Sequence, residues 1–292
     1  MGITIFTPTY NRAYTLEKLY NSLCNQTNKN FEWIIVDDGS TDNTKELIQN
    51  FINEKKIRIR YFYQKNSGKS MAHNKGVEFA SQEIFTCVDS DDYLTNDAIE
   101  VILNRWEKSR GKQVGILAKK VSSGGKDITI TTIKDKETFV LRKVYENKSL
   151  LGDTFLIFDT KVIKNFYFPK FDEEKFVPEA YLYDQIGEVG EVSFLNKGLY
   201  ICEYLADGYT QNMDKLIANN PKGYRCFVEQ RINLDSSLKS KFFDLIRYES
   251  ISFVIKKNYI FKGHILGSIL AFIPGYVLYK KRFKKFIQKR SV

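Results

Sequence analysis

Residues 31–53, FEWIIVDDGSTDNTKELIQNFIN, contain a strand, an acidic turn and a helix in immediate succession. Residues 32–36 form a short apolar, β-branched run that is typical of a buried strand. After the turn, residues 44–53 are expected to form a helix, in which Leu47, Ile48 and Phe51 recur at helical spacing and define one apolar face. A buried strand followed directly by an amphipathic helix is the repeating unit of α/β proteins, whose sheets are mostly parallel.

The same alternation runs through the first hundred residues and predicts a Rossmann-like, mostly parallel sheet flanked by helices. The other strands expected there cover residues 3–7, 57–63 and 84–88, and the other helices cover residues 13–25, 70–80 and 96–108. Later segments predict a strand at 114–120, a hairpin near 122–126 and helices between 210 and 257. We therefore expect an α/β domain over residues 1–205 and a helical C-terminal region over residues 206–292.

The composition of the 292-residue chain is that of a globular protein. Its 43% hydrophobic residues and only 5 prolines exclude collagen-like and disordered classes, because enough apolar surface exists to offset the entropy of ordering the backbone. The four cysteines lie far apart without metal-binding spacing, so we expect reduced thiols and a cytoplasmic protein. The first twelve residues lack the basic region and cleavage site of a signal peptide.

The net charge of +10 is concentrated in the last part of the sequence. All 35 acidic residues lie at or before Glu249, whereas ten of the 45 basic residues follow it, so residues 1–249 are balanced. These ten are Lys256, Lys257, Lys262, Lys280, Lys281, Arg282, Lys284, Lys285, Lys289 and Arg290. A neutral body with a basic tail argues against a nucleic-acid-binding protein and indicates that the tail meets an anionic partner.

Acidic residues directly follow two of the expected strands. Asp37 and Asp38 follow the strand at 32–36, where a carboxylate could bind a ribose or a base, or could simply form a turn and a helix cap. Asp89, Asp91 and Asp92 follow the strand at 84–88 and would repel one another unless a cation compensates them. Their hard oxygen atoms suit Mg²⁺ or Mn²⁺, although a solvated acidic turn would have the same pattern.

A third polar segment, NSGKSMAHNKGV at residues 66–77, opens a helix with Gly68 and Lys69. Backbone N–H groups and a lysine at such a position could meet phosphate oxygens, although the spacing is not that of a P-loop. His73 follows within the helix, where a lone histidine is usually structural. Because ligands of open α/β sheets bind at the carboxyl ends of the strands, we expect the polar segments to share one site.

Taken together, TPTYNR at 7–12, VDDGSTDNT at 36–44, the segment at 68–76 and VDSDD at 88–92 resemble family 2 glycosyltransferases of the GT-A fold. The resemblance covers about the first hundred residues. It implies an inverting transferase that uses a nucleotide sugar, commonly UDP-linked, with a divalent cofactor, Mn²⁺ or Mg²⁺. The residues that it assigns to the nucleotide pocket are Thr7, Pro8, Tyr10 and Asp38, with Asp38 on the uracil or ribose.

The resemblance also assigns roles to the later motifs. It places Asp89 near the ribose or sugar and makes Asp91 the metal ligand. Lys69 and His73 fall in the segment expected to contact the base or diphosphate, where such proteins often have Arg-Asn and this chain has His73-Asn74.

An inverting transferase needs a general base that removes the proton of the acceptor hydroxyl. In the family that the sequence resembles, this base is an acid in the second half of the sequence, often the Asp of a Glu-Asp pair that starts a helix. Here the matching stretch is FDEEKFVPEAYLYDQIG at 171–187, and the pair reads Glu179-Ala180. We therefore expect Glu179 as the base and Asp184, one turn later, in reserve, although Glu179 could equally serve only to stabilise the helix N-terminus.

The uncharged stretch at residues 263–279 is close to the lower limit of the ~17–25 residues that span a bilayer. It could form a marginal spanning helix, a helix packed into the core, or a segment lying on a membrane with residues 280–290 against anionic headgroups. The last interpretation fits best, and it predicts a peripheral protein at the inner face of the cell membrane.

The expected function is transfer of a sugar from a UDP-sugar donor to a glycan or lipid-linked acceptor in bacterial surface polysaccharide synthesis. A nucleotidyltransferase is an alternative with a similar α/β layout, but TPTYNR lacks the Gly-rich loop that would follow its first strand. A module that binds a sugar nucleotide or a membrane surface without turnover is the other alternative, and Ala180 is the main argument for it.

Overall fold

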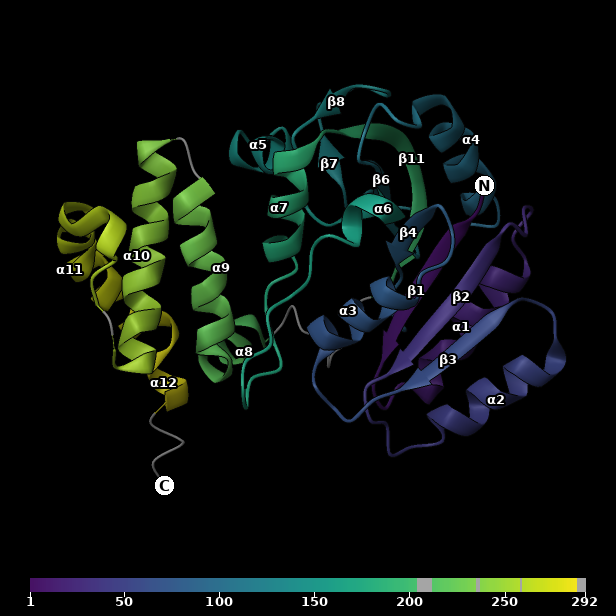
Figure 1. Ribbon diagram of the computed structural model, residues 1–292, viewed down its shortest axis with the longest axis horizontal. Helices are drawn as coiled ribbons and strands as arrows, with labels where there is room; N and C mark the ends of the chain where they lie inside the picture. The colour runs from purple at the N-terminus through teal and green to yellow at the C-terminus, as the bar shows by residue number, and fades with distance from the viewer. Residues whose placement is uncertain (204–211, 235–236, 258, 288–292) are drawn as a thin grey trace. The chain divides into compact units, whose positions relative to one another are not determined.

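The computed structural model of the chain describes residues 1–203, 212–234, 237–257 and 259–287 (Figure 1). The chain forms two compact units, one of Met1–Tyr167 with Leu182–Leu205 and one of Phe168–Tyr181 with Ala206–Val292. The expected domain boundary between residues 205 and 206 lies outside the described residues. The segment Phe168–Tyr181 belongs to the helical unit, although it precedes part of the α/β unit in sequence.

The first unit is built on a mixed sheet with the strand order β3-β2-β1-β4-β10-β6-β11-β5. The strands are β1 (Ile3–Thr9), β2 (Phe31–Asp37), β3 (Ile59–Tyr63), β4 (Ile84–Cys87), β5 (Tyr93–Leu94), β6 (Gly115–Ser122), β10 (Thr154–Asp159) and β11 (Val192–Cys202). In addition, β8 (Thr138–Phe139) pairs with β11, and β7 (Ile130–Thr131) with β9 (Leu150–Leu151). The predicted fold class, a mostly parallel α/β sheet with a helical C-terminal region, is confirmed.

The strand directions bring most carboxyl ends to one edge of the sheet. Strands β1 to β4 run parallel to one another, and β6 runs parallel to β11. Between these two groups, β10 is antiparallel to both β4 and β6. Since two antiparallel steps restore the original direction, β6 and β11 end at the same edge as β1 to β4. This shared edge is where all the polar motifs of the first hundred residues emerge.

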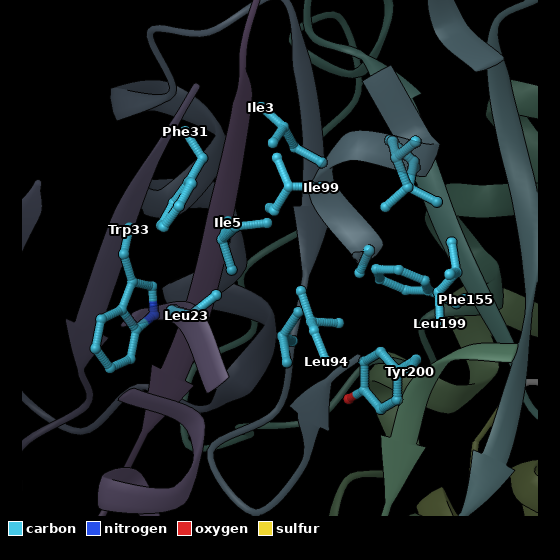
Figure 2. Packing of buried hydrophobic residues seen from close by; sticks show 14 of the residues in the cluster. Ile3, Ile5, Leu23, Phe31, Trp33, Leu94, Ile99, Phe155, Leu199 and Tyr200 are labelled. Carbon is cyan, nitrogen blue, oxygen red and sulfur yellow. The ribbon is translucent and has the colours of Figure 1, made fainter. Parts of the chain in front are cut away.

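Helices cover both faces of this sheet. On one face α1 (Ala13–Cys24), α2 (Thr44–Glu54) and α4 (Ala98–Ser109) pack on the large core cluster. The other face carries α3 (Lys69–Phe79), which lies in front of the strands in Figure 1. Figure 2 shows part of the core, with Ile5, Leu23 and Trp33 side by side. The remaining helices of this unit are α5 (Leu141–Glu146), α6 (Thr160–Ile163) and most of α7 (Ala180–Val189).

Period-2 alternation along β1 explains how its two faces are filled. Ile3 and Ile5 belong to the core cluster with α1, whereas Phe6 is buried on the side of α3. There the chain carries Gly76, and a Cβ atom on this glycine would lie 2.3 Å from the Phe6 ring. The absence of a side chain at Gly76 therefore lets α3 approach the sheet closely and fixes the position of its N-terminus at the shared edge.

The second unit is helical, as expected between residues 210 and 257. Its helices are α8 (Met213–Asn219), α9 (Pro221–Leu234), α10 (Leu238–Ile255), α11 (Ile265–Arg282) and α12 (Lys284–Ile287). Helix α10 lies between α9 and α11 (Figure 1). The buried cluster of this unit includes Phe227, Tyr248, Ile251, Ala271 and Phe283, so α11 and the residue after it contribute to the core.

Among the helices of the described residues, none combines the length and the apolar character needed to cross a bilayer.

A buried acid lies where α10 meets α11. Glu249 is fully buried, and a Cβ atom on Gly275 would lie only 2.5 Å from the Cβ of Glu249. Burial raises the pKa of Glu249 to about 7, and the Ser268 hydroxyl and the Arg225 guanidinium oppose this rise only in part. The neutral form of the carboxyl group is therefore favoured in the folded protein.

We expect the stability of this unit to fall as pH rises from about 4.5 to about 7. In this window the folded Glu249 still holds a proton that the unfolded chain, with a pKa of 4.5, has released. The cost of ionising it in the folded state amounts to at most about 3 kcal/mol above pH 7. Glu249→Gln should therefore raise the Tm by several degrees at pH 8 and change it little at pH 4.5, as measured by thermal unfolding.

The matched control is Glu173→Gln, at an exposed glutamate of the same unit. It should leave the Tm nearly unchanged at both pH values. An effect of Glu249→Gln that is the same at pH 4.5 and pH 8 would contradict the prediction.

Candidate functional site

Hydrogen bonds between loops tie together the carboxyl ends of β1, β2 and β3. The Asp38 N–H donates to the Thr9 carbonyl at 2.8 Å, and the Gln64 N–H donates to the Asp37 carbonyl at 2.9 Å. The Asp37 carboxylate accepts from the Ser40 N–H and from the Tyr61 hydroxyl, each at 2.8 Å. Asp37 therefore belongs to the framework beneath the site.

Asp38 orders the loop that leads into α3. Its side chain is buried, and Oδ1 accepts from Gln64 Nε2 and from the Ser67 N–H, both at 2.7 Å. Oδ2 accepts from the Gly68 N–H at 2.7 Å. The loop needs glycine at that position because its φ is +91°. The predicted contact of Asp38 with a uracil or ribose stays a prediction, and the structure adds this second role.

The three residues expected from β1 differ in what they expose. Thr7 is fully buried, and its Oγ1 accepts from Trp33 Nε1 at 2.9 Å. Pro8 is half-buried, and Tyr10 is exposed just beyond the strand. Within the nucleotide pocket that the sequence predicts, side-chain contacts would thus come from Pro8 and Tyr10, while Thr7 supports the strand from the core side.

The acidic motif and the Gly68-Lys69 motif meet at the shared edge. Lys69, the first residue of α3, places its Nζ 2.6 Å from Oδ1 of Asp89. The Asp89 N–H donates to the Tyr200 hydroxyl at 3.0 Å. Burial alone would raise the pKa of Asp89, but the charges of Lys69 and Lys120 outweigh it and lower that pKa. Asp89 is therefore an ionised carboxylate held between cations.

Asp92, the third acid of this motif, is bonded within the protein. It is buried, and its Oδ1 accepts from the Glu203 N–H at 2.9 Å. Burial and the charge of Asp89 raise the pKa of Asp92 to about 6. Lys120 on β6 lies nearby, with its Nζ 3.9 Å from the ring centroid of Tyr200.

Sequence reasoning missed Lys120 and Tyr200. Tyr200 is 111 positions from Asp89, and only the strand order brings β6 and β11 to the same edge. No local pattern distinguishes Lys120 from Lys119, the other lysine of its strand, so the contact could be found only from the three-dimensional structure.

Asp91, unlike Asp89, lies in an environment that disfavours its negative charge. It is half-buried, and burial together with the charge of Asp89 raises its pKa, while Arg12 and Lys69 oppose the rise. Within the described part of the chain, no group of three or more His, Cys, Asp or Glu side chains is arranged to hold a metal ion. One carboxylate next to a second negative charge still fits Mg²⁺ or Mn²⁺, because these ions often use one or two carboxylates and complete their shell with water and substrate phosphates.

His73 occupies the layer between α3 and the sheet. Its ring is buried and packs edge-on against Phe6 at 5.6 Å and Phe85 at 5.5 Å between centroids. This packing agrees with the structural role that a lone helical histidine usually has. Its predicted contact with the base or diphosphate stays a prediction.

Comparison with known proteins decides the family. Residues 4–167 match the family model described as "Glycosyl transferase family 2". The chain belongs to this family. The match covers every motif of the shared edge, from Thr7 to Asp92, and β10 as well.

Two curated relatives support the same family. Glycosyltransferase GlyA of Streptococcus pneumoniae is 31% identical over 203 residues, which are 68% of this chain and 28% of GlyA. The GalNAc(5)-diNAcBac-PP-undecaprenol beta-1,3-glucosyltransferase of Campylobacter jejuni is 29% identical over 184 residues, 62% of this chain and 58% of that protein. The aligned part of the chain thus spans less than two thirds of either relative.

A solved structure shows the same fold. S. aureus TarS 1–349 in complex with UDP-GlcNAc superimposes with a TM-score of 0.63 at 19% identity, covering 99% of this chain and 92% of that one. The family 2 transferase described here therefore has the GT-A fold that its sequence predicts.

The two acids expected as the base of this family 2 transferase lie on either side of the start of α7. Helix α7 begins at Ala180, one residue after Glu179, as the sequence predicts. Glu179 is exposed and belongs to the second unit, whereas Asp184 is buried and belongs to the first. The two candidates therefore differ sharply in how accessible their carboxyl groups are to a substrate.

Proposed function

We propose that the protein is an inverting glycosyltransferase that moves a sugar from a UDP-sugar to a hydroxyl group of a glycan or lipid-linked acceptor. The observation that carries the proposal is the ion pair of Lys69 and Asp89 beside Asp91, at the edge where the parallel strands end. A lysine at the first position of a helix of 11 residues, together with the carboxylate groups of Asp89 and Asp91, is suited to a nucleoside diphosphate bound to a sugar.

The relatives support the choice of substrates. The TarS structure contains UDP-GlcNAc, and the name of the C. jejuni relative describes an acceptor carried on undecaprenol. We extend these two descriptions to this chain and propose a UDP-sugar as its donor and a lipid-linked molecule as its acceptor.

The residues of the shared edge would divide the work as follows. Lys69 would move from its pairing with Asp89 toward the diphosphate, and Asp89 would then accept hydrogen bonds from ribose or sugar hydroxyl groups. Asp91 would hold a divalent metal, Mn²⁺ or Mg²⁺, which supplies positive charge where the UDP leaving group becomes more negative. Tyr200 and Lys120 would keep the acidic motif in place through the Asp89 N–H and the stacked ring.

The acceptor hydroxyl needs a base on the face opposite the departing UDP. We assign this role to Glu179, because its carboxyl group is exposed, whereas the carboxyl group of Asp184 is buried.

The test is UDP release from a panel of UDP-sugars, measured with the wild-type chain and with Lys69→Met. The wild-type chain should release UDP from at least one donor. Lys69→Met should weaken UDP binding by roughly 10–100-fold, because a charge-assisted contact to phosphate contributes about 1.5–3 kcal/mol. The control Lys45→Met removes an exposed lysine of α2 and should bind UDP normally.

Two results would overturn the proposal. Tight UDP-sugar binding without release of UDP, whatever the acceptor, would make the chain a binding module. Pyrophosphate release from UTP in the presence of a sugar phosphate would make it a nucleotidyltransferase.

A further inference from the structure

Helix α11 directs its small residues toward the core and its large apolar residues toward solvent. Ser268, Ala271 and Gly275 are its buried residues, and Gly275 approaches the α10 backbone so closely that a Cβ atom would lie 3.2 Å from the Ile246 carbonyl oxygen. A helix that merely covers a protein core shows the opposite arrangement, with its large apolar residues inside. The packing of α11 on α10 thus leaves its most hydrophobic side unused by the second unit.

The exposed side is continuous along the helix, and we call it the apolar face of α11. Each of its side chains keeps between 40% and 73% of its surface exposed. They are Ile265, Leu266, Ile269, Leu270, Phe272, Ile273, Tyr276 and Val277. At about 100° per residue these positions cover an arc of roughly 160°. A contiguous apolar surface of this kind marks a site of protein or membrane contact.

Basic residues follow the apolar face directly. Lys280 and Lys281 lie in the last turn of α11, and Lys284 and Lys285 lie in α12. Arg282 differs from them because it is already paired with Asp214, its Nη2 lying 2.5 Å from Oδ1. The sequence holds no acidic residue from 250 to 292, so the positive charge of this segment has no counter-charge within it. Lys289 and Arg290 lie outside the described residues.

We propose that the apolar face of α11 inserts into the surface layer of a bilayer that contains anionic lipid, with Lys280, Lys281, Lys284 and Lys285 against the headgroups. Apolar residues on one side of a helix with lysines at its end are suited to the boundary between acyl chains and charged headgroups. The proposal concerns the second unit alone and holds whichever sugar the first unit transfers.

A second copy of the chain is the other occupant that the apolar face could have. In a symmetric dimer the same patch meets itself, so the four lysines of one chain would meet α11 and its flanks in the other copy. Whichever way the two helices run, that stretch carries basic residues at both ends and no acidic residue. Such a contact leaves like charges facing each other, whereas anionic headgroups neutralise them. The charge of the segment therefore favours a lipid surface.

The two components of binding should respond differently to salt. Each basic residue near an anionic surface raises partitioning by ~5-fold, so four lysines together account for several hundredfold at low ionic strength. Salt screens this part. The inserted apolar side chains are not screened, so some binding should persist at high salt.

The experiment is sedimentation of the full chain with vesicles of phosphatidylcholine alone or with a quarter phosphatidylglycerol, at low and high salt. Removing the tail would be a poor test, because Ala271 and Phe283 belong to the core of the second unit. The face variant instead carries four substitutions at positions at least 59% exposed, which are Leu266→Ser, Leu270→Ser, Ile273→Ser and Val277→Ser. The charge variant carries Lys280→Ser, Lys281→Ser, Lys284→Ser and Lys285→Ser.

Matched controls separate these effects from general hydrophobicity and net charge. Leu238→Ser with Phe243→Ser removes two apolar side chains of α10 that are 85% and 52% exposed. A charge control removes four exposed lysines of the first unit, through Lys108→Ser, Lys112→Ser, Lys126→Ser and Lys148→Ser. Both controls should partition like the wild-type chain.

We expect the face variant to lose at least tenfold in partitioning at both salt concentrations. The charge variant should lose its preference for phosphatidylglycerol and keep the weak binding to phosphatidylcholine. All variants should keep the UDP affinity and Tm of the wild-type chain. A negative result for membrane binding would therefore not count against the proposed transfer reaction.

The proposal would be overturned if the face variant partitioned into vesicles as strongly as the wild-type chain. It would equally be overturned if the wild-type chain sedimented as a dimer without vesicles and the face variant as a monomer, since the apolar face would then be an interface between copies.

Discussion

Replacing Asp91 by asparagine is expected to lower kcat by roughly 10³-fold, the scale of losing a group that stabilises charge in a transition state. It should also make the affinity for UDP independent of Mn²⁺. Asparagine keeps the size of the side chain but removes the negative charge that would attract the metal, in a place where burial and Asp89 already disfavour that charge. Calorimetric titration of UDP with and without Mn²⁺, combined with UDP-release kinetics, measures both effects.

Asp127→Asn is a suitable control, because Asp127 is an exposed acid of the hairpin paired with Lys119. It should change neither the kinetics nor the response to metal. If Asp91→Asn retains a metal-dependent UDP affinity equal to that of the wild-type chain, Asp91 is not the metal ligand.

Glu179→Gln is expected to lower kcat by ~10²–10⁴-fold and to leave the affinity for the UDP-sugar almost unchanged. Glutamine has the shape of glutamate but cannot take a proton from the acceptor hydroxyl. The measurement is UDP release at saturating donor and acceptor, with donor affinity obtained separately by titration. Glu188→Gln, which changes an exposed residue of the same helix, is the control and should leave kcat nearly unchanged.

The companion variant Asp184→Asn should behave differently, because Asp184 is buried in α7. Its expected effect is a change in Tm with a much smaller change in kcat. If the Asp184→Asn variant were inactive with normal stability while the Glu179→Gln variant stayed active, the base would be Asp184, one turn further along the helix.

Local patterns were sufficient to predict the elements of the first hundred residues. The helix expected at 44–53 is observed at Thr44–Glu54, and the strand expected at 84–88 is observed at Ile84–Cys87. Periodicity determines these elements because each buries one face or lies wholly inside. The strand expected at 3–7 continues to Thr9 in the structure, through a proline. Its pairing with β4 ends at Phe6, so Pro8 is paired with β2 alone and its missing N–H is tolerated there.

The contacts that complete the site could not be predicted in the same way. The insertion of an antiparallel β10 between β4 and β6, which sets where Lys120 and Tyr200 lie, depends on pairing between strands distant in sequence. The second use of Asp38, as the acceptor for a loop 29 and 30 positions away, has the same origin. In the C-terminal part, charge counting located the basic segment, but which side of α11 is buried follows from its packing on α10.

The bonds that Asp38 makes have a consequence for how a ligand is received. Its two oxygen atoms hold the backbone of Ser67 and Gly68 through hydrogen bonds within the protein itself. The conformational entropy of that loop is therefore lost during folding, and association does not have to remove it again. A nucleotide would meet a preorganised surface, and the amide hydrogens of Ser67 and Gly68 should exchange with solvent as slowly as those of a strand, although they lie in a loop.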